Sequence, residues 1–87
     1  MICQKIRCKV AYEEYFIEHC VDATAVGIGG SVPDAQQDAR DAALGEHRAW
    51  SRTDVHISGE PTFESATPEE AEADRIRRLH HFAHADQ

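Results

Sequence analysis

The chain has 87 residues and a formal net charge of −7, from 16 acidic and 9 basic side chains. This length predicts a single domain over 1–87, and a hydrophobic content of 41% predicts a folded chain. No apolar run approaches the ~20 residues of a membrane span, and no signal peptide opens the sequence, so we expect a soluble protein of the cytoplasm.

The acidic surplus bears on the kind of partner. A net negative surface repels nucleic acid and acidic membranes, and it favours a basic partner. The alternative is that the charge only keeps the surface solvated, as in many small soluble proteins.

The first predicted element is a strand over 2–10. Apolar and polar residues alternate, so Ile6 lies on one face while Lys5, Arg7 and Lys9 lie on the other. A break at 11–14 separates it from a second strand. The three basic residues form a stripe, which is either a cross-strand pairing surface or a nucleic-acid footprint.

The second strand is predicted over 15–21, as the partner of the first in an antiparallel hairpin. In that arrangement the basic stripe faces Glu14 and Glu18. A tight turn at Asp22–Ala23 then leads to a third, short strand over 24–28, which the following glycines end.

A helix over 32–50 comes next. Ser31 is a suitable N-cap, and Pro33 falls in the first turn, where a missing N–H group has no cost. The alanines of this helix recur at helical spacing, which lets it lie close to a sheet. Trp50 is expected to anchor the helix end in the core; the alternative is an exposed binding residue.

A fourth strand is predicted over 53–58, with a possible continuation over 62–64 after a bend. A C-terminal helix over 67–83 then begins with a capping box between Thr67 and Glu70. Its apolar stripe is narrow and is expected to pack on the domain or on a second copy in a homodimer. The stripe consists of Ala73, Ile76, Leu79, Phe82 and Ala83.

These elements predict an α+β fold with a three- to four-stranded antiparallel sheet in the order β-β-β-α-β-α. One helix packs on the sheet, and a C-terminal helix is appended. Within the single domain, residues 1–66 make the sheet and its helix, and residues 67–83 make the C-terminal helix.

Residues 27–44 carry a recognisable pattern of a strand, a G-x-G-x-S turn and regularly spaced alanines. This stretch resembles the last strand, loop and helix of double-stranded RNA-binding domains. The matching residues are Gly27, Gly29, Ser31, Ala35, Ala39, Ala43 and Leu44. The resemblance implies a helix packed on an antiparallel sheet; the same pattern occurs in HicB-type antitoxins and small phage proteins.

The chain departs from that family where the family contacts RNA. There, a lysine pair follows the serine and another lysine follows the first alanine, and these grip phosphates. In this sequence Val32, Pro33 and Gln36 stand at those positions, with Asp34 and Asp38 nearby. This helix start is therefore predicted to repel a phosphate backbone.

Two chemical sites are weighed and set aside. His80, His81 and His84 form an H-H-x-x-H pattern in which the first and last share a helix face, but a histidine-rich helix end explains it without a metal. Cys3 and Cys20 can pair only if the hairpin aligns Lys5 with Glu18, and reduced thiols are expected. We predict no cofactor, no metal and no catalytic constellation.

The sequence therefore favours a small acidic binding protein that is not an enzyme. Its size and charge resemble those of small phage-encoded inhibitors such as anti-CRISPR proteins, which implies host cytoplasm and a host protein with a basic, nucleic-acid-binding surface as the partner. The predicted partner-binding residues are Glu13, Glu14, Asp34, Asp38, Asp41, Glu69, Glu70 and Glu72.

Two other roles stay open. The first is a nucleic-acid-binding module that uses the basic stripe of the first strand or the arginines Arg75, Arg77 and Arg78 of the last helix. The second is a dimeric, antitoxin-like protein joined through the C-terminal helix.

Overall fold

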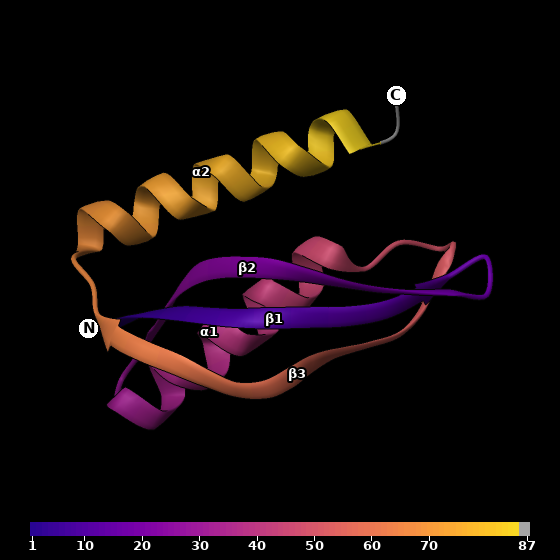
Figure 1. The fold of residues 1–87 in the computed structure, drawn as a ribbon. Helices are drawn as coiled ribbons and strands as arrows, with labels where there is room; N and C mark the ends of the chain where they lie inside the picture. Colours follow the sequence, from indigo (N-terminus) through magenta and orange to yellow (C-terminus); the bar gives the residue numbers. More distant parts are fainter. Residues whose placement is uncertain (86–87) are drawn as a thin grey trace.

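The computed structural model describes the backbone of residues 1–85 and the side chains of residues 1–80. The elements in chain order are β1 (Ile2–Glu14), β2 (Ile17–Gly29), α1 (Val32–His47), β3 (Arg52–Ser65) and α2 (Pro68–Ala85). The strands form one antiparallel sheet in the order β2-β1-β3. Helix α1 covers one face, and α2 runs beside β2 (Figure 1). The α+β class is confirmed. No helix in the described part of the chain is long and apolar enough to cross a bilayer.

The first hairpin is longer than the sequence predicts. Strand β1 continues through 11–14, and a two-residue turn at Tyr15 and Phe16 follows, closed by the pair Glu14 and Ile17. Both turn residues have positive φ, 53° and 66°, as in a type I′ turn. The turn was missed because type I′ turns favour Asn-Gly, and positive φ costs a residue with a side chain roughly 1–2 kcal/mol.

The predicted turn at Asp22–Ala23 is also wrong, because β2 is continuous and these residues pair with Lys9 and Cys8 of β1. The chain therefore has no separate strand over 24–28, and the observed order is β-β-α-β-α. Strand β3 likewise continues through the predicted break. It bulges where its pairing with β1 skips from Ser58 to Thr62.

Close approach between α1 and β2 builds the core. A Cβ atom added at Gly27 would lie 2.2 Å from the backbone N of Ala39 and 2.3 Å from the carbonyl O of Ala35. One added at Gly29 would lie 2.6 Å from the Ala35 backbone N. The helix thus rests directly on the strand, with Ala35, Ala39 and Ala43 fully buried between them. This is the physical reason for the glycine and alanine spacing of residues 27–44.

The predicted start of α1 is confirmed, but its predicted end is not. The backbone N–H of Asp34 donates to the Ser31 hydroxyl over 3.3 Å, so Ser31 is the N-cap. The helix ends at His47, and Trp50 lies beyond it with 94% of its surface exposed. The expectation that Trp50 anchors the core is therefore wrong.

Helix α2 begins with the predicted capping box, in which the Glu70 N–H donates to the Thr67 hydroxyl over 3.1 Å. It runs from Pro68 to Ala85, two residues further than expected. Its apolar stripe does not face the sheet, because Ile76 and Leu79 are both more than half exposed. Polar side chains hold this helix instead.

We expect Gly27→Ala to unfold the protein or to lower its free energy of unfolding by about 2–4 kcal/mol, since the helix must move off the strand. Chemical denaturation followed by circular dichroism measures the change. Gly45→Ala is the matched control, because a Cβ at this helical position meets nothing within 4 Å. Alanine there should raise the stability by about 0.5–1 kcal/mol. A Gly27→Ala variant as stable as wild type would contradict the close packing.

Candidate functional site

The predicted acidic residues fall on two surfaces at opposite ends of the sheet. Glu13 and Glu14 end β1, whereas the acids of α1 and α2 lie near its beginning. A strand of 13 residues spans ~40 Å at ~3.3 Å per residue, so the two groups do not form one site. We call them the hairpin end (the Tyr15–Phe16 turn, the strand ends beside it and the loop 48–51) and the N-terminal groove.

The N-terminal groove is a hollow of about 440 Å³ between α1, α2 and β2. Its apolar lining includes Met1, Val26 and Ile28, and its rim carries Asp38 of α1 and Glu72 of α2. The structure thus brings one acid from each helix to a shared groove, which helical spacing alone does not predict.

Several of the predicted acids already have partners within the chain. Asp38 accepts the backbone N–H of Ile28 over 2.8 Å, and Glu72 binds Arg75 through two hydrogen bonds of 2.7 and 3.1 Å. Glu70 belongs to the capping box. These carboxylates stabilise the fold, so they are less available to a partner than Asp34 or Glu69, which are exposed.

Asp74 attaches α2 to the sheet, and the sequence analysis missed it. Its carboxylate accepts the backbone N–H of Val26 over 3.0 Å and pairs with Arg77 and Arg78 at 2.9 and 2.8 Å. Arg77 also pairs with Glu46 of α1 and donates to the Thr24 carbonyl. The unpaired edge of β2 is thereby hydrogen-bonded by α2.

These contacts change the predicted role of the C-terminal arginines. Arg75, Arg77 and Arg78 all hold carboxylates of the same chain, and the pairs of Arg77 raise its pKa above its ordinary value. Burial raises the pKa of Asp74, but its bonds from Val26, Arg77 and Arg78 outweigh burial and hold the pKa below its ordinary value. The arginines of α2 are therefore engaged in holding the helix in place.

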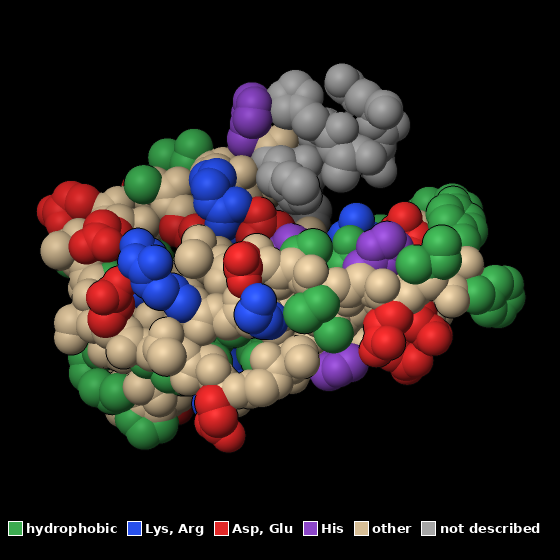
Figure 2. Space-filling model, viewed as in Figure 1, with side chains coloured by type: hydrophobic (Ala, Val, Ile, Leu, Met, Phe, Trp, Pro, Cys, Tyr) green, Lys and Arg blue, Asp and Glu red, His purple; other side chains and the backbone are tan. Residues whose placement is uncertain are grey.

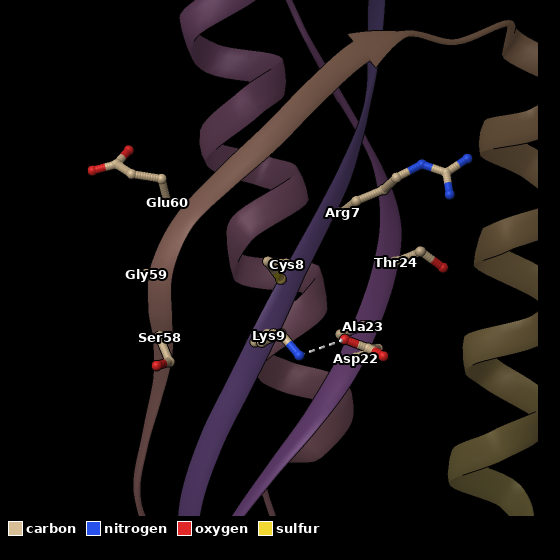
Figure 3. A pocket seen from close by; sticks show the side chains of 9 residues that line it. All are labelled: Arg7, Cys8, Lys9, Asp22, Ala23, Thr24, Ser58, Gly59 and Glu60. Carbon is tan, nitrogen blue, oxygen red and sulfur yellow. Dashed lines mark ion pairs between the residues drawn. The ribbon is translucent and has the colours of Figure 1, made fainter.

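The basic stripe lies on the face of the sheet opposite α1, which we call the outer face. Arg7 pairs with Glu64 at 3.5 Å and Lys9 with Asp22 at 3.4 Å, all four side chains being more than half exposed. The stripe borders a shallow basin of about 600 Å³ (Figure 3). The predicted partners Glu14 and Glu18 are wrong, because the longer hairpin shifts the register.

Glu14 instead helps to fix the hairpin end. Its carboxylate accepts the Arg52 guanidinium over 2.8 Å, which lowers the pKa of Glu14, and lies 3.5 Å from the Ser51 hydroxyl. Arg52 also donates to the His47 carbonyl and stacks on the Tyr12 ring, 4.2 Å from its centroid. One arginine therefore joins the hairpin, the end of α1 and the start of β3.

Acids without a basic partner surround this end. Glu13 and Glu18 stand directly opposite each other across the hairpin. With Asp54, His56 and Tyr12 they line a hollow of about 340 Å³. No lysine or arginine in the described chain forms an ion pair with these three carboxylates.

The cysteine and metal alternatives are resolved for the described residues. The register places Cys3 opposite Ile28 and Cys20 opposite Ala11, so Cys3 and Cys20 cannot pair, and all three cysteines are free. Burial raises the pKa of the Cys8 thiol, which disfavours a reactive thiolate. No group of three metal-ligating side chains occurs among residues 1–80. The side chains of His81 and His84 lie outside the described residues.

No protein-family model matches the chain, and no curated protein or solved structure gives a significant match. The likeness of residues 27–44 to double-stranded RNA-binding domains therefore stays a prediction of kinship. What the structure confirms is the packing behind it: a strand ending in glycines, a capped helix start and alanines against the sheet.

We expect the docking of α2 to weaken in acid. Because the pKa of Asp74 is lowered in the fold, its contribution is complete above the unfolded pKa and is lost as pH falls through the folded pKa. Hydrogen exchange at the Val26 amide, corrected for the intrinsic pH dependence of exchange, measures this loss between pH 6 and pH 2, taken as about the range in which carboxylates titrate.

Asp74→Asn is the matching variant. It should expose the Val26 amide already at neutral pH, by about 1–3 kcal/mol of local opening free energy, and should remove most of the acid dependence. Asp41→Asn, on the exposed side of α1, is the control and should leave Val26 protected. Equal protection of Val26 in wild type and Asp74→Asn would show that Asp74 does not hold the helix.

Proposed function

We propose that this chain is a non-enzymatic acidic binding protein that covers a basic, nucleic-acid-binding surface of another protein, as small phage-encoded inhibitors do. The observation that carries the proposal is the distribution of charge after internal pairing. Six of the nine basic side chains are used in ion pairs within the chain. Many carboxylates have no such pair and remain to meet positive charge from outside.

The acids that form no ion pair with lysine or arginine are spread over the surface. They are Glu13, Glu18, Asp34, Asp38, Asp41, Asp54, Glu60, Glu69 and Glu70. An excess of solvated negative charge speeds the encounter with a basic surface and competes with phosphate for it. Nucleic acid itself is repelled by the same field.

The test is capture of a partner by the tagged protein from lysate of the source cell, followed by competition. We expect a captured protein that is released by raised salt and by short duplex DNA or RNA, because the duplex and the chain occupy the same basic surface. Asp34→Lys with Asp41→Lys should weaken capture and reduce its salt dependence. A complex indifferent to salt, to duplex and to charge reversal would contradict the proposal.

A second candidate is supported by the outer face of the sheet. Lys5, Arg7 and Lys9 project from its central strand beside an open basin, and their exposed ion pairs contribute little, so phosphates can replace the carboxylates (Figure 3). In this reading the chain is a nucleic-acid-binding module, and the acidic net charge limits its affinity.

Fluorescence anisotropy with short duplex RNA at low salt separates the two candidates. The proposed function predicts no binding, because the surface as a whole repels phosphate. Binding that Lys5→Glu with Lys9→Glu abolishes would establish the second candidate in its place. Glu60→Gln is the control, since it removes a charge at the rim of the basin without touching the stripe.

The homodimer through α2 also stays a prediction. Its motivation is that Ile76 and Leu79 are exposed on a helix whose contacts with the sheet are polar.

A further inference from the structure

The largest exposed apolar side chains of the molecule gather at the hairpin end. Tyr15 is 71% exposed, Phe16 fully exposed and Ile17 62% exposed, all in or beside the turn. Trp50 is 94% exposed in the loop that leads into β3, whose Ser51 contacts Glu14 next to the turn. Figure 2 shows hydrophobic side chains projecting at this end, on the right, with acidic ones below them.

This exposure does not serve the fold. Tyr15 and Phe16 occupy the two positive-φ positions of the turn, where asparagine and glycine would be relaxed. Neither ring gains the burial that would offset the strain. Strained backbone that presents solvent-exposed aromatic rings points to a binding role.

The aromatic side chains are also held in a defined place. Arg52 ties Glu14, directly before the turn, to the His47 carbonyl and to the Tyr12 ring. The loop carrying Trp50 lies between these anchored points. The rings are thus presented on a rigid base, which lowers the entropy lost on binding.

The charge beside the aromatic group identifies its occupant. Glu13 and Glu18 face each other without a basic partner, an arrangement that disfavours the free hairpin. Asp54, with a positive φ of 55°, joins them around one hollow. A cation placed there would relieve the repulsion, and arginine in particular can bind carboxylates and stack on aromatic faces together.

We propose that the hairpin end is the docking surface for an arginine-rich segment of the partner protein. Guanidinium groups bind Glu13, Glu18 and Asp54 while their planes stack on Tyr15, Phe16 and Trp50. This inference rests on the proposed function, and it selects one surface and one side-chain chemistry from it. Nucleic acid fits less well, because the same carboxylates repel phosphate.

A short arginine–glycine peptide is the probe, with a lysine–glycine peptide of equal length and single-stranded oligo-dT as comparisons. Trp50 is the only tryptophan, so its fluorescence reports contact directly. We expect the arginine peptide to shift the Trp50 emission to the blue and to bind more tightly than the lysine peptide. Binding of oligo-dT with no response to the arginine peptide would overturn the proposal.

The decisive variant is Tyr15→Asn with Phe16→Gly. It supplies the preferred residues of a type I′ turn, so the fold should be retained or stabilised, while affinity for the arginine peptide should fall about tenfold. Glu13→Gln with Glu18→Gln should cost about fivefold in affinity. Asp34→Asn with Asp41→Asn removes equal charge elsewhere and should change affinity by less than about twofold.

Three further results separate this proposal from the proposed function. If the Tyr15→Asn/Phe16→Gly variant binds like wild type, the hairpin end is not the docking surface. If the α1 variant loses as much affinity as Glu13→Gln/Glu18→Gln, a basic partner binds but not here. If wild type ignores the peptide while the salt-sensitive complex from lysate persists, only the docking surface is wrong.

Discussion

The contact of α1 with β2 is the constraint on which the rest of the structure depends. Gly27 and Gly29 leave no room for a side chain, and the alanines of α1 fill the remaining space. Only Ile6 and Val10 are large side chains that are fully buried, so the core is held by short distance rather than by bulk. Any side chain added at this contact separates the helix from the sheet.

Because the core is thin, charged residues complete the architecture at both ends of the sheet. Asp74 attaches α2 to the edge of β2, and Arg52 joins the hairpin, α1 and β3. Each is multiply bonded and at least half-buried among its partners, which is where ion pairs contribute most. Most of the cations are consumed in this way, and the remaining surface is left acidic.

Local signals predicted the helices well, since caps depend on neighbouring residues: Ser31 and the Thr67–Glu70 box behave as expected. The hairpin was mispredicted because its turn holds Tyr15 and Phe16, whose local preference opposes the conformation that the two long strands impose. That one error moved every cross-strand pair, so the partners of the basic stripe were wrong as well. The tie made by Arg52 and the exposure of Trp50 depend on long-range contacts, which no local pattern encodes.

The hydrogen bonds along β2 have a consequence for solubility. An uncovered edge strand offers its backbone groups to any other strand, and this is a common route to aggregation. Here Asp38 and Asp74 occupy the N–H groups of Ile28 and Val26, and Arg77 occupies the Thr24 carbonyl. The opposite edge, β3, is interrupted by a bulge and Pro61. Side chains and irregularities thus close a three-stranded sheet to further strands, and α2 acts as its edge cover.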